Sequence, residues 1–79
     1  MGNKRLDRLR QRPKDFTWDE LVALLESLGY RLKNGKGSRR KFIDDQNQKI
    51  SLHEPHPDNT MKMYLVDKVL TALEEHGKI

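Results

Sequence analysis

Apolar positions over residues 16–28 repeat with the period of a helix. The stripe is spaced i, i+3, i+4, i+7 and consists of Leu21, Leu24, Leu25 and Leu28. Thr17-Trp18-Asp19-Glu20 fits a capping box, in which Thr17 is the N-cap and Glu20 reaches back to it. Gly29 suits the left-handed residue that ends a helix. These signals predict a helix over residues 18–28.

The pattern changes to alternation of apolar and polar positions in short segments between residues 30 and 53. Short alternating segments over 30–33, 39–43 and 48–53 are separated by Asn34-Gly35-Lys36-Gly37 and Asp44-Asp45-Gln46-Asn47, which have the composition of turns. Pro55 and Pro57 then end the last segment, because proline cannot donate to a strand ladder. We expect a three-stranded antiparallel meander.

A second helical pattern occupies residues 60–75. Its apolar stripe consists of Met61, Leu65, Val69, Ala72 and Leu73. Asp58, Asn59 and Thr60 precede it as candidate caps. The predicted fold is therefore α+β with the order α-β-β-β-α, a meander with both helices on one face.

Alternation also assigns the two faces of this sheet. The expected core, drawn from helices and strands, is Leu21, Leu24, Leu28, Leu32, Phe42, Ile50, Leu52, Leu65, Val69 and Leu73. The opposite face then carries Arg31, Lys33, Arg39, Lys41, Lys49, Ser51 and His53. A slip of one residue would bury these charges, so the register is well specified. Arg40 falls on the inner side, and we expect its long side chain to extend to an edge.

Length and charge narrow the class of protein. A chain of 79 residues with 34% hydrophobic residues and no cysteine allows one small domain without disulfides. Residues 1–14 carry six basic side chains and one acidic one, so we expect 1–15 to be a basic, flexible arm and 16–79 to be the folded domain. No apolar run is long enough for a membrane span, and no apolar signal segment is visible at the start. We expect a cytoplasmic protein with no membrane partner.

The second basic cluster lies within the predicted sheet. Residues 31–41 hold six cations and no acid. Such a cluster suits a polyanion, through phosphate contacts and counterion release. The candidate RNA-binding residues are Arg31, Lys33, Lys36, Ser38, Arg39, Arg40, Lys41 and Lys49. Two alternatives stay open: an ordinary solvated sheet face, and a surface for an acidic protein that mimics RNA.

Several short motifs occur in a familiar order. Leu28-Gly29-Tyr30, then Gly37-Ser38-Arg39-Arg40-Lys41-Phe42, then Ile50-Ser51-Leu52-His53-Glu54-Pro55-His56-Pro57 lie between the two predicted helices. In this arrangement the chain resembles the HicA family of toxins from bacterial toxin–antitoxin pairs, over about residues 16–77. The resemblance implies a fold like that of double-stranded-RNA-binding domains and a ribosome-independent mRNA endoribonuclease. It also implies a HicB-like antitoxin as partner, which covers the active site.

The chain departs from this family at one chemically important position. The resemblance implies a catalytic histidine directly after Gly-Ser, but Arg39 stands there. Arginine stays protonated and is a poor base, although it can hold a phosphate and stabilise its charge. His53 is predicted to share the outer face with Arg39, so it is the candidate for the missing imidazole. His56 lies in the family's Pro-His element, where a structural role in the turn is the stronger interpretation.

The sequence thus supports one leading function and one alternative. The leading function is an RNA-binding toxin, a metal-independent mRNA endoribonuclease with His53 as catalytic base and Arg39 as phosphate ligand, neutralised by a HicB-like antitoxin. The alternative is a catalytically inactive protein of the same fold that binds RNA or the antitoxin. We expect no metal site, because His53-x-x-His56 lacks a third ligand, and no small-molecule cofactor. A purely structural module that binds a protein is the third, more distant possibility.

Overall fold

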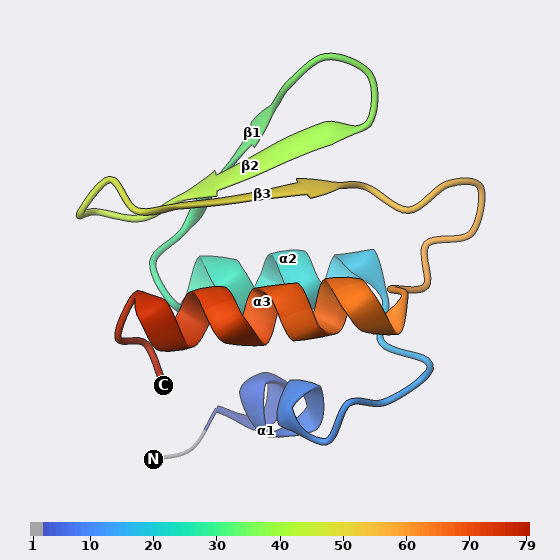
Figure 1. Ribbon diagram of the computed structural model, residues 1–79, viewed down its shortest axis with the longest axis horizontal. Coiled ribbons are helices and arrows are strands. Elements are labelled where there is room, and N and C mark those ends of the chain that lie inside the picture. Colours follow the sequence, from blue (N-terminus) through green and yellow to red (C-terminus); the bar gives the residue numbers. More distant parts are fainter. Residues whose placement is uncertain (1–2) are drawn as a thin grey trace.

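The computed structural model describes residues 3–79 and shows three layers (Figure 1). Its elements are α1 (Lys4–Arg10), α2 (Trp18–Ser27), β1 (Arg31–Asn34), β2 (Arg39–Ile43), β3 (Lys49–His53) and α3 (Met63–Glu75). The sheet forms one layer, α2 and α3 lie beneath it, and α1 lies on the far side of these two helices. The α+β fold, with an antiparallel meander between helices, is confirmed. None of the helices in the described part of the chain is long and apolar enough to cross a membrane.

Helix α2 begins at the predicted residue and ends at Ser27, one residue before the predicted end, with Leu28 as C-cap. The Thr17 hydroxyl accepts a hydrogen bond from the Glu20 backbone N–H at 3.2 Å, as an N-cap does. Gly29 has a φ of 96°, the left-handed conformation that a helix end requires. At the first turn, the ring centroids of Trp18 and Phe42 lie 5.6 Å apart, so the start of α2 packs against β2.

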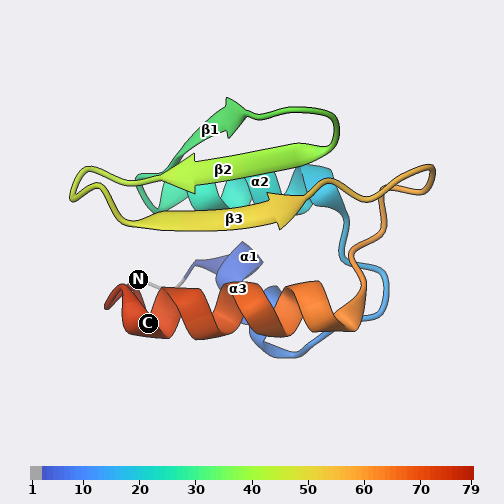
Figure 2. The same ribbon diagram turned by 45° about the horizontal axis from the view of Figure 1, so that its top comes forward.

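The three strands pair in the order β1-β2-β3, each antiparallel to its neighbour (Figure 2). Leu32 pairs with Phe42, and Phe42 pairs with Ile50, so the predicted apolar positions share one face. This face lies against the helices, and the other face is open. The register is the one that the alternation predicts.

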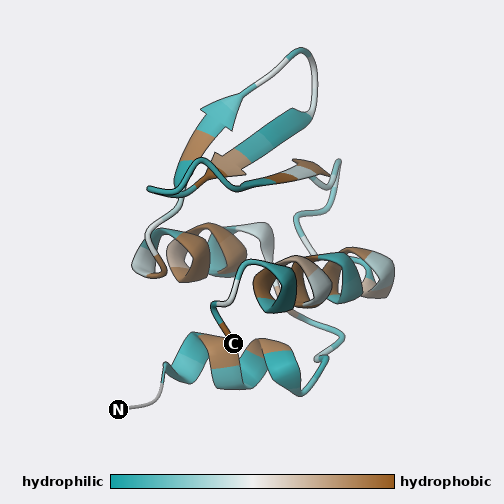
Figure 3. Ribbon diagram, turned by 60° about the vertical axis from the view of Figure 1, so that its left-hand side comes forward, coloured by the Kyte–Doolittle hydropathy of each residue, from teal (hydrophilic) through white to brown (hydrophobic). Residues whose placement is uncertain are grey.

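The core contains most of the predicted residues. Eight of the ten, all but Leu28 and Leu32, are at most 6% exposed. Leu32 stays partly exposed on β1, which is an edge strand. Brown, hydrophobic segments of the helices face one another and the sheet in Figure 3.

The start of α3 differs from the prediction. The helix begins at Met63, with Lys62 as N-cap and no capping side chain. Asp58 instead accepts hydrogen bonds from the N–H and hydroxyl of Thr60, and Thr60 forms a β-bridge with Thr17. Met61 is buried in the preceding loop rather than in the helix. The polar cluster 58–60 therefore shapes a turn, because its side chains bond locally and not to the helix.

The N-terminal segment contains a short helix that the sequence pattern did not predict. Residues 4–10 form α1, whose N-cap Asn3 accepts from the backbone N–H groups of Arg5 and Leu6. Leu9 of α1 is fully buried and belongs to the hydrophobic core. Arg8 donates to Glu20 at 2.7 Å and to Asp15 at 3.0 Å. The short helix therefore packs against both α2 and α3.

Four residues tie the C-terminal end of α3 to the sheet. The Tyr30 hydroxyl lies 2.6 Å from Nδ1 of His76, and Lys78 lies over the Tyr30 ring and 3.2 Å from Asp44. Asp44 is 2% exposed and accepts from the backbone N–H groups of Gln46 and Gln48. Burial opposes ionisation of Asp44, but the hydrogen bond from Gln48 and the Lys78 ammonium outweigh it and lower its pKa. Burial, together with the charge of Asp44, raises the pKa of Tyr30 to about 12.

Candidate nucleic-acid interface

The open face of the sheet gathers the cations that alternation assigned to it. Lys33 pairs with Lys41, and Lys41 pairs with Ser51 on the next strand. Arg39 pairs with His53, and Ile43 lies between Arg31 and Lys49. All of these side chains except the half-buried Ile43 are exposed. The predicted polar face is therefore present in the predicted register.

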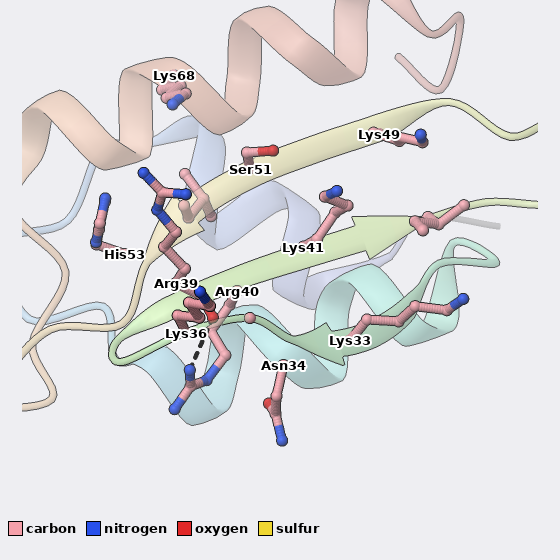
Figure 4. Close-up of a pocket in the computed structure, with 13 residues that line it drawn as sticks. Lys33, Asn34, Lys36, Arg39, Arg40, Lys41, Lys49, Ser51, His53 and Lys68 are labelled. Atoms are coloured by element: carbon pink, nitrogen blue, oxygen red, sulfur yellow. Dashed lines mark hydrogen bonds between the residues drawn. The ribbon is translucent and has the colours of Figure 1, made fainter.

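A groove of about 770 Å³ runs over this face. It is lined mostly by basic and polar residues, with two apolar ones and no acid, namely Lys33, Asn34, Gly35, Lys36, Arg39, Arg40, Lys41, Ile43, Lys49, Ser51, Leu52, His53 and Lys68. We call it the cationic groove. Figure 4 shows Arg39 extending from β2 across β3, with its guanidinium near His53 and on the side of Lys68 in this view. A concave surface lined by one sign of charge concentrates the field on an oppositely charged ligand.

Lys68 is a member of this groove that sequence reasoning missed. It comes from α3, which runs alongside β3, and not from the sheet (Figure 4). The buried stripe of α3 includes Leu65 and Val69, so Lys68 is left on the exposed side of the helix. That signal excludes Lys68 from the core, but only the docking of α3 beside β3 brings it to the groove.

His53 is held by two contacts from the segment just before β2. Its Nδ1 lies 3.2 Å from the Ser38 hydroxyl. The backbone N–H of the next residue, Glu54, donates to the Ser38 carbonyl at 2.8 Å. Directly opposite residues of antiparallel strands have Cβ atoms about 4.5–5.5 Å apart, so Arg39 and His53 can act on one phosphate.

Arg40 stands apart from the other cations of the groove. Its guanidinium donates to Glu54 at 3.0 Å and to the carbonyls of Gly37 and Arg39 at 2.9 and 2.8 Å. Three of its five N–H donors are thus engaged within the chain. Arg40 therefore shapes the loop before β2, and the Nη2 amino group is the part of its guanidinium left for a ligand.

The remaining candidates are distributed around the groove. Lys36 lines it from the loop between β1 and β2, whereas Arg31 lies on the open face outside the lining. Ser38 does not line it and instead contacts His53. His56 is exposed in the loop after β3, where it lines a second groove together with His53.

A model of one protein family matches most of the chain. The family model described as the HicA toxin of bacterial toxin–antitoxin systems matches residues 18–77. The chain belongs to the HicA toxin family. The match begins at α2 and ends just beyond α3, so it covers the sheet, its open face and both flanking helices, but not α1. No curated protein and no solved structure matches the chain.

Family membership places the protein in a toxin–antitoxin system, and HicA toxins pair with antitoxins. In this HicA protein the residues Gly37-Ser38 are followed by Arg39 rather than histidine. The imidazole nearest to that position in the sheet belongs to its strand partner, His53.

Proposed function

We propose that this HicA protein is an RNA-binding toxin that cleaves mRNA without the ribosome and is neutralised by a HicB-like antitoxin in the cytoplasm. The observation that carries the proposal is the pairing of Arg39 with His53 at one end of a groove lined by no acid. Phosphates of single-stranded RNA bind along Lys33, Lys41 and Lys49 through charge. An acidic antitoxin surface fits the same face and blocks it.

The chemistry follows from the two side chains. Nε2 of His53 takes the proton of a ribose 2′-hydroxyl, whose oxygen then attacks the adjacent phosphorus. The bond from phosphorus to the 5′-oxygen breaks, and that oxygen leaves with a proton taken from water. The products are a 2′,3′-cyclic phosphate and a 5′-hydroxyl. Arg39 donates to the phosphate oxygens and stabilises the charge that develops on them.

The test is expression of the chain without its antitoxin, followed by growth and mRNA integrity. We expect the wild type to stop growth and cleave mRNA, and His53→Ala to reduce cleavage by about 100–10,000-fold, the contribution of a general base. The His53 side chain is exposed, so His53→Ala should leave RNA binding and thermal stability nearly unchanged. His56→Ala is the matched control and should stay toxic.

The alternative function has its own signature in the same experiment. If the wild type binds RNA but neither cleaves it nor stops growth, the protein is an inactive RNA-binding or antitoxin-binding member of the family. The observation that favours this alternative is Arg39 itself, which cannot serve as a base. If His53→Ala and His56→Ala both keep full cleavage, the histidine mechanism is wrong.

A further inference from the structure

A second groove opens next to His53, on the side of the molecule where β3 leads into α3. It has a volume of about 870 Å³, and its walls include Pro55, Pro57, Met61, Met63 and Leu65. Tyr64 also lines it and is 65% exposed, the one large hydrophobic side chain left open in the described part of the chain. We call it the tyrosine groove. Its walls are far more apolar than those of the cationic groove.

The two grooves adjoin each other at one side chain. His53 lines both of them. Lys68 of the cationic groove and Tyr64 of the tyrosine groove are four residues apart on α3, so they lie on the same face of the helix, one turn from each other. Tyr64 and His53 also line the tyrosine groove together, so a ligand with a phosphate at Arg39 and His53 has the Tyr64 ring in the adjoining groove.

The charged residues of the tyrosine groove favour an anionic chain. Lys14 and Lys62 line it. Of its two acids, Glu54 pairs with Arg40 at 3.0 Å, so only Asp58, which accepts from Thr60, offsets the two lysines. A polyanion that carries flat apolar groups fits both grooves together, and this is the chemistry of a single-stranded nucleic acid.

We propose that Tyr64 is a base-stacking platform, on which the nucleobase next to the phosphate at Arg39 and His53 is stacked. The proposal rests on the proposed RNA-binding function and names the subsite that takes the base. Unpaired bases stack on exposed aromatic rings largely irrespective of sequence, because every base has a π face. The ring fixes the nucleotide, and the cationic groove holds the backbone on either side. Tyr64 is a binding residue here and takes no part in proton transfer.

The test compares two probes that share phosphates but not bases. One is a short single-stranded RNA with a 2′-O-methyl group at every ribose, which cannot be cleaved through its 2′-oxygen. The other is inorganic polyphosphate of similar length. We expect Tyr64→Ala to weaken RNA binding about tenfold, as loss of one stacked base does, with polyphosphate binding unchanged. Tyr64→Phe keeps the ring and should bind RNA like the wild type, and Thr71→Ala, an exposed change on the same helix, should affect neither probe.

A second variant separates this proposal from the proposed function. Replacing Arg39, Lys41 and Lys49 together by alanine should weaken binding of RNA and polyphosphate alike. If that variant behaves so while Tyr64→Ala binds RNA as the wild type does, the base platform is overturned and the cationic groove stands. An equal loss of both probes with Tyr64→Ala also overturns it, because stacking cannot act on polyphosphate. If the wild-type chain binds neither probe, the proposed function fails and the platform fails with it.

Discussion

At the scale of single residues, the contact of Ser38 with His53 bears on the proposed role of His53 as a base. A neutral imidazole has one donor and one acceptor nitrogen. For Nε2 to accept a proton, Nδ1 must carry the hydrogen and donate it to the Ser38 hydroxyl, which lies 3.2 Å away. In the proposed mechanism Ser38 is thus a positioning residue: its hydroxyl accepts this hydrogen and holds the imidazole in place, from the Gly-Ser motif that precedes Arg39.

Removal of this hydroxyl tests the assignment. Ser38→Ala should lower kcat for RNA cleavage about tenfold, part of the ~100–10,000-fold that a general base contributes. KM should stay close to the wild-type value, and Ser38→Thr should restore most of kcat because it keeps a hydroxyl. Steady-state kinetics on a defined RNA measure both constants. A rise in KM with kcat unchanged would mean that Ser38 binds the RNA directly instead.

The elements differ in how far local sequence determined them. Helix α2 and the three strands were predictable because capping, period and turn composition all act within a few residues. The outward positions of Arg39, Lys41, Lys49 and His53 followed from alternation alone. The start of α3 was not predictable in this way, because 58–60 bond among themselves and leave the helix to begin without a side-chain cap.

Helix α1 shows the limit of local reasoning most clearly. Only Leu6 and Leu9 are apolar in a segment dominated by cations, so its pattern is too short to separate from a loose tail. What holds it is distant in sequence: Arg8 binds Glu20 of α2, and Arg12 binds Asp67 of α3 at 2.8 Å. The Arg8 side chain hydrogen-bonds to Glu20 and lowers the pKa of that carboxyl. Asn3 as N-cap was the one local signal in the sequence.

One substitution measures whether α1 belongs to the folded unit. Leu9 is fully buried, so Leu9→Ala should reduce the free energy of unfolding by about 2–5 kcal/mol. Arg10→Ala, one residue away and exposed, should change it by less than about 0.5 kcal/mol. Urea unfolding of both variants gives the comparison. Equal stabilities for wild type and Leu9→Ala would show that residues 1–15 are the flexible arm expected from their composition.

The whole molecule separates its charges by side. Several acids are paired within the chain, including Asp15 and Glu20 with Arg8, Glu54 with Arg40, and Asp67 with Arg12. The cationic groove has no such partners in its lining. The net charge of +4 therefore understates the positive potential of the open face, because the acids that offset its cations in that sum lie outside the groove lining. This imbalance favours a polyanionic ligand or an acidic partner at the groove.

The C-terminal cluster links the stability of the whole molecule to pH. The pKa of Asp44 is lowered in the folded state, because the Gln48 N–H and the Lys78 ammonium outweigh burial. In the unfolded chain the pKa of an aspartate is about 3.9. The folded state therefore binds this proton less readily, and its contribution to stability is fully present above that value. The contribution is lost as the pH falls through the lower, folded pKa.

Asp44→Asn should flatten this acid dependence. The amide oxygen can still accept from the Gln46 and Gln48 N–H groups, but no charge remains to pair with Lys78. Urea unfolding at neutral pH should show the variant less stable than the wild type. At about pH 3, below the unfolded-state pKa of ~3.9, the same measurement should show a smaller difference in stability between the variant and the wild type. Asp45→Asn, at the exposed neighbouring position, should follow the wild type throughout. If the gap between Asp44→Asn and the wild type stays constant across this range, Asp44 gains no stability from its charge and the cluster is held by the uncharged contact of Tyr30 with His76.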